Sequence, residues 1–341
     1  MARPHGILRA GFPYLTTLGM RRVSNFPTDI AFGPDEPVYI LMRSDTALVR
    51  IWSVNDQDEL TDDLKGFGSY GSEDGQFVWP VNIISGPDSD LFISDEWNNR
   101  ITRFDAEGKF ISKFGTEGDA EGEFRGPSGI AFDHEDNIVV VDSKNHRVQK
   151  YTASGDYVSE FGVNGDQEGE LDLPWGIDID EAGDIYVADW GNNRVQIFSA
   201  EGEFKKSFGE LGSGEGQFNR PTGVSVDAHG DIYVADWGNN RVLQFNSEGQ
   251  YIWGFTGDAT LSKVARNYML TNAVSNRLRE AGRIEHERYL RRPRSVRVDS
   301  KFRLFIPDYE SYRIQVYQKD FLELDETQFA APLRNPTLEV T

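Results

Sequence analysis

Residues 221–255 read PTGVSVDAHGDIYVADWGNNRVLQFNSEGQYIWGF, and this stretch decides the fold. It contains four short runs rich in β-branched and aromatic residues, separated by turns built from Gly, Asn, Asp and Ser. Such a pattern predicts one four-stranded up-and-down sheet. Because the sheet carries apolar residues on both faces, it cannot bury them alone, so copies of it must stack around an axis.

The same unit recurs along the chain with a period of 47 residues. Two residue types mark the period: Pro80, Pro127, Pro174 and Pro221, and Arg100, Arg147, Arg194 and Arg241. Further units begin at Pro27 and Pro293, which makes six, and a fixed period of this length indicates repeated supersecondary units. We therefore predict an all-β fold, a six-bladed β-propeller of four-stranded antiparallel blades. It forms a single domain over residues 1–341, with blades that begin near residues 27, 80, 127, 174, 221 and 293.

A ring of six blades must close, since an open sheet edge is a template for pairing with other chains. Two segments are candidates for the missing outer strand of blade six, residues 14–19 and residues 321–325. The N-terminal segment is favoured because Thr17-Leu18-Gly19 resembles Ser207-Phe208-Gly209, which ends a fourth strand. We expect ring closure by residues 14–19.

The repeat motifs resemble those of the NHL-repeat β-propeller family. They are Pro-x-Gly-[Ile/Val], Tyr-Val-Ala-Asp, Asn-Asn-Arg-Val-Gln and a Phe-Gly followed by Gly-Gln-Phe, and the resemblance covers roughly residues 14–325. It implies the propeller fold. It implies less about function, because the family includes RNA-binding modules, protein-interaction modules and a peptide-amidating lyase, and one fold supports many functions.

The composition narrows the setting. The chain has 341 residues, a net charge of −21 and no Cys, so disulfides and thiol chemistry are excluded. Residues 1–19 contain no apolar core long enough for a signal peptide, and no segment approaches a membrane span. We expect a cytoplasmic protein without a membrane partner; a mature secreted form that has lost its leader is the alternative. The acidic balance repels polyanions at long range, which disfavours nucleic acid as a partner.

Five blades carry an Asp followed five residues later by an Arg, at the turn between the second and third strands. These pairs are Asp95/Arg100, Asp142/Arg147, Asp189/Arg194, Asp236/Arg241 and Asp308/Arg313. A carboxylate and a guanidinium at this spacing can form a charge-assisted contact that fixes the turn or joins neighbouring blades. Because the pair recurs in nearly every blade, we assign it to structure and look for function where the blades differ.

One face of the predicted ring is rich in aromatic residues. In a propeller, the loops that enter the first strands and the loops that join the second to the third strands emerge on the same face. Here these loops supply large aromatic side chains, which we expect to bind a ligand at the mouth of the central channel: Trp79, Trp97, Trp175, Trp190, Trp237 and Tyr309. Packing between blades is the alternative role for some of these rings.

Departures from the repeat gather on the same face. The second position after the blade Pro is Gly in three blades, and in the others it is Asp29, Asn82 and Ser295. These three blades are contiguous once the ring closes. Together with Arg43 and Arg294 they form a polar cluster that we expect to bind an anionic or polar ligand near the channel mouth. Drift in terminal repeats is the alternative explanation.

The family resemblance adds one expectation about activity. Residues 38–45, VYILMRSD, resemble the first-blade segment of the amidating lyases, in which the Arg that matches Arg43 is an active-site residue. Those lyases hold zinc through His residues after the blade Pro, and their catalytic Tyr stands where this chain has Trp97. The positions after the Pro carry no His here and read Thr28, Val81, Ser128, Trp175, Thr222 and Arg294. We therefore do not expect a His-zinc amidating lyase or a bound metal.

The last two blade prolines are 72 residues apart, 25 more than the period. The additional segment, about residues 258–291, is predicted to be helical from Leu261 to Leu290, with a break at Gly282. Residues 257–294 carry nine Lys or Arg and four Asp or Glu. Three roles are open for this basic segment: a docking helix for a partner, neutralisation of the acidic ring, or a lid that brings a cation to a bound anion from Arg277, Arg283, His286 or Arg288.

These observations lead to three functional hypotheses. The first is a propeller that binds a small anionic molecule or a peptide at the aromatic and basic mouth, without a cofactor. The second is a lyase or hydrolase at the same mouth, in which Arg43 and Arg294 stabilise developing negative charge while Asp29 or His286 transfers a proton. The third is an RNA- or protein-interaction scaffold, with the helical insertion as a contact for a protein partner. A divalent metal held by Asp29 and Asn82 would favour the enzyme.

Overall fold

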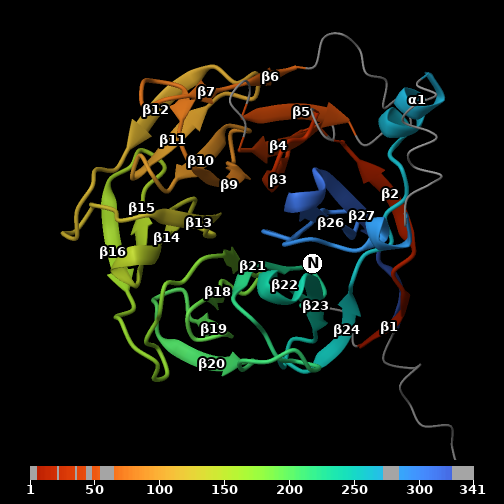
Figure 1. Ribbon diagram of the computed structural model, residues 1–341. Coiled ribbons are helices and arrows are strands. Elements are labelled where there is room, and N and C mark those ends of the chain that lie inside the picture. Colours follow the sequence, from red (N-terminus) through yellow and green to blue (C-terminus); the bar gives the residue numbers. More distant parts are fainter. Residues whose placement is uncertain are drawn as a thin grey trace, which may run out of the picture.

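The structure is a computed structural model that describes residues 6–20, 23–34, 37–43, 48–53, 65–271 and 284–324. Within these residues the chain forms six four-stranded antiparallel sheets, arranged as blades around a central axis (Figure 1). The prediction of an all-β six-bladed propeller is confirmed. The first strand of each blade lies nearest the axis and the outermost strand lies at the rim.

The strands of each blade are given from the axis outward. Blades one and two comprise β3 (Pro27–Phe32), β4 (Pro37–Met42), β5 (Val49–Ser53) and β6 (Gly66–Phe67), then β9 (Pro80–Ser85), β10 (Leu91–Asp95), β11 (Arg100–Phe104) and β12 (Phe110–Phe114). Blades three and four comprise β13 (Pro127–Phe132), β14 (Ile138–Asp142), β15 (Arg147–Tyr151) and β16 (Tyr157–Phe161), then β17 (Ile177–Ile179), β18 (Ile185–Asp189), β19 (Arg194–Phe198) and β20 (Phe204–Phe208). Blades five and six comprise β21 (Pro221–Val226), β22 (Ile232–Asp236), β23 (Arg241–Phe245) and β24 (Tyr251–Phe255), then β25 (Arg297–Val298), β26 (Arg303–Asp308), β27 (Arg313–Gln318) and β2 (Tyr14–Leu18).

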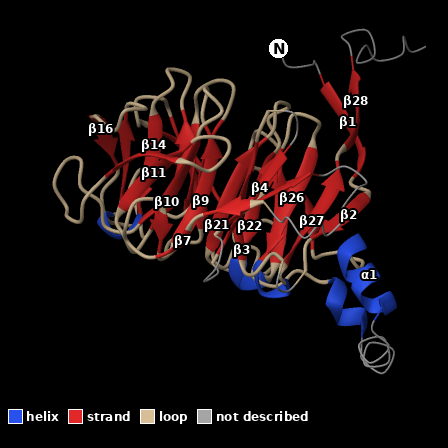
Figure 2. Ribbon diagram, turned by 90° about the horizontal axis from the view of Figure 1, so that it is seen from above, coloured by secondary structure: helices blue, strands red, loops and turns tan. Residues whose placement is uncertain are grey.

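Short elements mark the face on which the second-to-third turns lie. Three of these turns contain the 3-10 helices η1 (Ser143–Asn145), η2 (Trp237–Asn239) and η4 (Tyr309–Ser311). The connection from blade one to blade two contains the short parallel strands β7 (Ser69–Tyr70) and β8 (Gln76–Phe77). In Figure 2 the short helices lie along one edge of the ring, and the ribbon of β1 (Gly6–Gly11) and β28 (Asp320–Leu324) projects from the opposite edge.

The outer strand of blade six comes from the N-terminal part of the chain. Strand β2 pairs with β27, so that Tyr14 lies opposite Tyr317 and Leu18 lies opposite Ile314. The other candidate segment, residues 321–325, lies mostly in β28, which pairs with β1 instead. The ring is therefore joined by hydrogen bonds between strands that lie far apart in the sequence.

The core consists of apolar side chains packed between neighbouring blades. Leu41, Ile93 and Phe104, from blades one and two, are fully buried in one such cluster. The blade connections add further buried side chains at equivalent points of the repeat: Phe77, Phe124, Leu171, Phe218 and Leu290. These side chains are buried between the blades, which explains why Gly-Gln-Phe or a close variant recurs at the first four of these points.

The repeated Asp and Arg form a network that joins neighbouring blades. In blade five, Asp236 is fully buried and accepts hydrogen bonds from Arg241 Nε at 2.8 Å and from the Asn219 N–H at 2.7 Å. The Arg241 guanidinium also donates to the carbonyls of Gly214 and Gln217, in the connection from blade four. Equivalent contacts are made in three further blades by Arg147, Arg194 and Arg313.

Blade two departs from this network. Asp95 accepts hydrogen bonds from the backbone N–H groups of Trp79 and Trp97, each at 3.0 Å. Arg100 donates to carbonyls of the preceding connection, while its Nε is buried without a hydrogen-bond partner. Burial lowers the pKa of Arg100. In four other blades the equivalent carboxylate is hydrogen-bonded to the Arg. In blade two it instead accepts hydrogen bonds from the backbone N–H groups of two tryptophans.

The insertion before blade six is less helical than the sequence predicts. Its described part contains one α-helix, α1 (Lys263–Thr271), and the 3-10 helix η3 (Ile284–Arg288). The predicted break at Gly282 and the lid residues Arg277 and Arg283 lie in residues 272–283, outside the described residues. Figure 1 places α1 outside the ring, beside β2, and not over the channel. In the part of the chain that the structure describes, no helix is long and apolar enough to cross a membrane.

The last part of the insertion follows the path of an ordinary blade connection, so the predicted helix between the break at Gly282 and Leu290 is wrong. Arg313 donates to the carbonyls of Glu287 and Tyr289, as the equivalent arginines do in other blades. The Leu290 N–H donates to the Thr256 carbonyl at 2.8 Å. In an α-helix that ended at Leu290, this N–H would donate to the carbonyl of His286 instead, so its bond to Thr256 excludes that helix.

A buried charged cluster anchors β1 and the start of β28 to blade five. Lys319 is 2% exposed, and its Nζ lies 2.5 Å from Asp227 and 2.9 Å from Asp231. Arg9 of β1 donates through Nε to Asp231 at 2.8 Å. Burial alone would raise the pKa of Asp231, but the hydrogen bond from Arg9 and the charge of Lys319 bring it below its ordinary value.

Replacing Asp236 by Ala should lower the free energy of unfolding by about 3 kcal/mol, because it leaves the Arg241 guanidinium without its counter-ion in a largely buried place. Chemical denaturation measures the change. Lys205→Met is the control, since it removes a more exposed ion pair with Asp184 and should change stability by less than about 1 kcal/mol. Equal effects in the two variants would contradict a structural role for the network.

The cluster around Asp231 predicts a pH-dependent stability. Because the folded pKa of Asp231 lies below the ordinary value of 3.8, its stabilising contribution is present above pH 3.8 and is lost as the pH falls through the folded pKa. The destabilisation caused by Asp231→Asn should therefore be largest near neutral pH and shrink at lower pH. Denaturation of both proteins at a series of pH values measures this difference, and a difference that does not change with pH would refute it.

Candidate functional site

The first strands of the blades approach one another closely around the axis. Gly129, Gly176 and Gly223 lie where one blade meets the next. A Cβ on Gly129 would lie 2.6 Å from the carbonyl oxygen of Trp175, and a Cβ on Gly223 would lie 2.8 Å from the Cα of Ser295. A side chain at either position would force the neighbouring backbone to move, so the Gly of Pro-x-Gly is a packing requirement.

Blades one and two carry polar side chains where three other blades carry glycine. Asp29 is fully buried and accepts hydrogen bonds from the Ile83 N–H at 3.0 Å and from Asn82 Nδ2 at 2.6 Å. Asn82 Oδ1 accepts a hydrogen bond from the Ile130 N–H at 3.0 Å. Arg297 of blade six donates to both oxygens of Asp29, at 2.9 and 3.1 Å. These two side chains therefore join blades six, one, two and three.

This bonding decides what Asp29 and Asn82 can do. Both oxygens of Asp29 are engaged with Arg297, so the carboxylate holds blades together and is poorly placed to transfer a proton to a ligand. The Asn82 amide is committed on both sides as well. Among the described residues, no group of three or more His, Cys, Asp or Glu is arranged to hold a metal ion.

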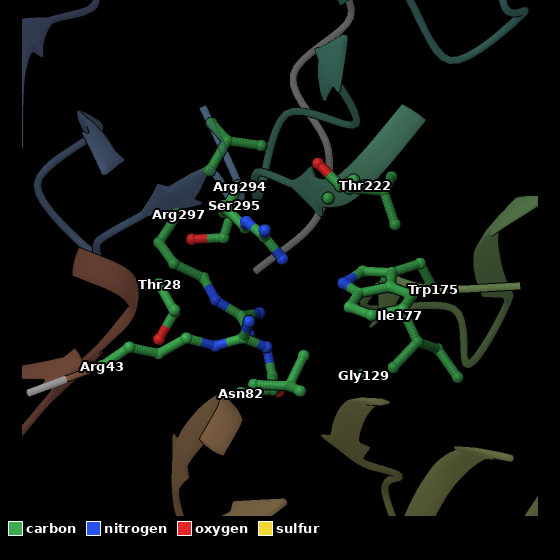
Figure 3. A pocket seen from close by; sticks show the side chains of 15 residues that line it. Thr28, Arg43, Asn82, Gly129, Trp175, Ile177, Thr222, Arg294, Ser295 and Arg297 are labelled. Atoms are coloured by element: carbon green, nitrogen blue, oxygen red, sulfur yellow. The ribbon is translucent and has the colours of Figure 1, made fainter. Parts of the chain in front are cut away.

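A cavity lies at the axis, on the face of the second-to-third turns. Its lining includes Thr28, Arg43, Asn82, Trp175, Thr222, Arg294, Ser295 and Arg297. Figure 3 shows the side chains of Arg43, Arg294 and Arg297 reaching toward the centre, with Trp175 on the opposite side. The free volume is about 20 Å³, which is room for about one water molecule. Three guanidinium groups and one indole therefore fill most of the space.

Among the described residues, two of the three guanidinium groups have no counter-ion at hydrogen-bond distance, whereas Arg297 has the carboxylate of Asp29. Arg43 Nε and Nη2 are buried without a hydrogen-bond partner, and the carboxylate of Glu96 lies 3.7 Å from Nη2. The same carboxylate lies closer to Lys144, at 3.1 Å. Arg294 Nε is also buried without a partner. Arg43 and Arg294 are therefore incompletely compensated cations at the channel mouth.

The surroundings of Arg294 disfavour its charge. Burial, and to a smaller degree the neighbouring charge of Arg43, lower the pKa of Arg294 to about 10. The adjacent Ser295 Oγ is buried and has no hydrogen-bond partner. An anion with acceptor oxygens is the group that would pair with such donors, since charge-assisted hydrogen bonds are the strong ones.

Four arginines on this face lie over aromatic rings. The pairs and their distances to the ring centroid are Arg43 on Trp79 (5.4 Å), Arg294 on Tyr309 (4.5 Å), Arg220 on Trp190 (4.6 Å) and Arg292 on Trp237 (4.9 Å). The arginines of the first two pairs line the cavity, whereas the last two pairs line a separate groove beside it. In all four pairs the guanidinium lies within the distance range of a favourable cation–π interaction.

The structure brings most of the predicted site residues to this face, in three groups. The cavity is lined by Arg43, Asn82, Trp175, Arg294 and Ser295, with Asp29 bonded to its wall. Trp79, Trp97 and Tyr309 lie next to them, and Trp190 and Trp237 line the groove. His286 is the exception. It lies exposed in η3, packs near Tyr289 at 6.3 Å between ring centroids, and does not line the cavity.

Arg297 is the functional neighbour that the sequence analysis missed. A signal for it exists, because the equivalent first-strand positions in the other blades are Ala31, Ile84, Ala131, Asp178 and Ser225. Asp178 is the other charged member of this ring of positions. It lines a second cavity of about 330 Å³ on the far side of Arg297, accepts a hydrogen bond from the Val226 N–H at 2.8 Å, and has its pKa raised by burial.

Comparison of the sequence with known protein families shows which family of propellers the chain belongs to. The family described as 6-bladed beta-propeller (DUF5128) matches residues 78–166 and 177–272, which is more than half of the chain. The protein belongs to this family. No curated protein matches the chain.

Solved structures of the same fold cover nearly the whole chain. Streptogramin B lyase is 11% identical with a TM-score of 0.58, over 90% of this chain and 98% of the lyase. Virginiamycin B lyase from Staphylococcus aureus is 16% identical with a TM-score of 0.56, over 90% of this chain and 99% of the lyase. The WD40 beta propeller domain of Doa1 is 10% identical with a TM-score of 0.58, over 91% of this chain and 98% of the domain. Likeness to such different proteins at this identity shows the fold alone.

Relieving the charge in the cavity should stabilise the protein. Arg43→Met and Arg294→Met each remove one of two neighbouring cations that lack close counter-ions, and we expect each to raise the free energy of unfolding by about 1 kcal/mol. Arg147→Met removes a fully paired guanidinium and should destabilise instead. Chemical denaturation in a buffer free of multivalent anions measures all three. Destabilisation of similar size in all three variants would show that the cavity arginines support the fold.

Proposed function

We propose that the protein binds a small anionic ligand at the mouth of the central channel, through Arg43 and Arg294. The observation that carries the proposal is this pair of guanidinium groups, which have buried N–H donors and no hydrogen-bonded counter-ion among the residues that the structure describes. Buried donors without partners cost free energy, and a carboxylate or phosphate would pair with them. The ligand would supply negative charge at hydrogen-bond distance, whereas the nearest carboxylate that the described residues place at Arg43 is that of Glu96, at 3.7 Å.

The dimensions of the cavity suit one end of a ligand. A free volume of about 20 Å³ cannot hold a whole organic molecule beside the arginine side chains. The anionic group would therefore bind at the outer side of the guanidinium groups, and the rest of the ligand would lie on the face. Because the whole chain carries a net charge of −21, the cationic mouth would select small anions over long polyanions, which the acidic surface repels.

The repeats themselves support an assignment to the NHL type within the six-bladed propellers. Tyr-Val-Ala-Asp occurs at residues 186–189 and 233–236, and Asn-Asn-Arg-Val at 192–195 and 239–242. In the structure these motifs form the second strand, the turn and the third strand that carry the Asp–Arg network. This assignment concerns the architecture and does not by itself choose a ligand.

A lyase or hydrolase at the same mouth is the second candidate. The two lyases described above share the fold, and Arg43 corresponds to an active-site Arg of the amidating lyases that the repeats resemble. A reaction of this kind also needs a group that moves a proton. Asp29 is bonded to Arg297, and His286 does not line the cavity. Binding without chemistry is therefore the better fit to the residues at the site.

Binding of simple anions tests the proposal. Isothermal titration at low ionic strength, with acetate and with inorganic phosphate as probes, should detect binding of at least one of them in the millimolar range or tighter. Arg43→Met and Arg294→Met should each weaken this binding by about tenfold or more, through loss of charge-assisted hydrogen bonds.

The matched control is Arg220→Met. Arg220 also lies over a Trp on the same face, but it lines the groove and not the cavity. Its substitution should leave the affinity nearly unchanged. An equal loss of affinity in all three variants, or no binding of either probe by the unaltered protein, would rule out a specific anion site at Arg43 and Arg294.

A further inference from the structure

Two exposed tryptophans form a pair beside the cavity. Trp79 is 44% exposed and Trp97 is 61% exposed, although large aromatic residues are usually covered. Their ring centroids are 5.5 Å apart and their planes meet at 62°. Two indoles in mutual contact at the surface form a contiguous apolar patch, and such patches mark places where something binds.

The backbone holds this Trp79–Trp97 pair in a defined geometry. The N–H groups of Trp79 and Trp97 both donate to one oxygen of Asp95, each at 3.0 Å. The Glu96 N–H donates to the Trp79 carbonyl, also at 3.0 Å. This is the use of Asp95 that sets blade two apart from the other blades. The two rings are therefore presented by a fixed turn, which lowers the entropic cost of binding to them.

Two tryptophans at the equivalent turns of blades four and five lie under cations, whereas among the described residues none lies over Trp97. Trp190 lies under Arg220 and Trp237 lies under Arg292, two arginines that each stand directly before the first Pro of the following blade. The residue at that position after blade two is Gly126. Among the described residues no cation lies over the Trp97 ring. A glycine at this one point of the repeat leaves the indole open.

We propose that the Trp79–Trp97 pair binds the apolar part of the same ligand, and that the ligand is an aromatic carboxylate. This inference rests on the proposed function, because it uses the anion position at Arg43 as its other half. Arg43 lies over Trp79 at 5.4 Å and lines the cavity, so one residue connects the indole pair with the channel mouth. A carboxylate on the arginines would place an attached ring against the indoles.

The charges at the channel mouth favour this occupant over others. A basic ligand would be repelled by Arg43 and Arg294, and a neutral apolar ligand would leave their buried N–H groups without partners. An aromatic ring suits two indoles that meet at 62°, since aromatic pairs prefer edge-to-face and offset arrangements over face-to-face stacks. An acid that joins both groups by a short linker satisfies both halves of the site.

The test compares three probes on the same protein: acetate, phenylacetate and the uncharged phenylacetamide. Isothermal titration at low ionic strength should give phenylacetate an affinity about tenfold higher than acetate, in line with a modest aromatic contribution. Phenylacetamide should bind at least tenfold more weakly than phenylacetate, because it lacks the charge. Trp97→Ala should bring phenylacetate to within about threefold of acetate while acetate itself is unchanged.

The matched control is Trp253→Ala. Trp253 is similarly exposed, at 57%, but it lies on β24 at the rim of blade five. Its substitution should leave the ratio of the two affinities as it is. Equal binding of acetate and phenylacetate, or a ratio that survives Trp97→Ala, would overturn the aromatic subsite while leaving the anion site in place. If neither acid binds although inorganic phosphate does, this inference fails and the anion site stands. If phosphate does not bind either, the proposed anion site fails, and this inference fails with it.

Discussion

The distance between the first strands at the axis is the constraint on which the rest of the structure depends. Three junctions are so close that glycine is required, and at Gly129 and Gly176 an added Cβ would meet backbone oxygen at 2.6 Å. The junction of blade one with blade two and that of blade two with blade three are made differently. There the side chains of Asp29 and Asn82 accept hydrogen bonds from backbone N–H groups of the next blade. Arg297 then compensates the buried charge of Asp29. The polar side chains Asp29, Asn82 and Arg297 at the channel therefore serve first to join neighbouring blades into a closed ring.

The cationic mouth follows from the same asymmetry. Once Asp29 is used by Arg297, the described cavity holds no close carboxylate for Arg43 and Arg294. Placing two cations side by side in a partly dry cavity lowers the stability of the fold, and interactions elsewhere must offset this loss. The Asp–Arg network, repeated at Arg147, Arg194, Arg241 and Arg313, supplies stabilising interactions at four of the second-to-third turns. The stability that the repeated Asp–Arg pairs provide therefore allows the fold to keep the two cations Arg43 and Arg294 at the channel mouth.

Much of the fold could be predicted from the sequence, because each blade is a local pattern of strands and turns with a fixed period. The turn chemistry was informative at the level of single residues: Asn193 and Asn240 have left-handed backbones, as their type suggests. The insertion was harder, since its helical periodicity competes with contacts to Arg313 that an ordinary blade connection must make. Long-range contacts overrode local preference there.

The site was only partly visible in the sequence, for a related reason. Asp29 stood out as a departure from glycine, but its partner Arg297 is 268 residues away, and no local pattern pairs them. In the sequence, the aromatic residues of this face occupy similar turn positions and cannot be told apart. Their difference depends on the next blade, which covers Trp190 with Arg220 and leaves Trp97 open beside Gly126. Roles that depend on a neighbour in space require the assembled ring.

The closure of blade six also shapes the order in which the chain can assemble. Strand β2 precedes all the other strands of the ring in the sequence, whereas its partner β27 follows nearly all of them. Pairings across such a long loop form slowly and late, since loop closure must come before their contacts stabilise anything. During synthesis the early blades can form in turn while residues 14–18 wait without a partner. A nascent chain therefore carries an unpaired strand, open to chaperones or to premature pairing, until the ribosome has made β27.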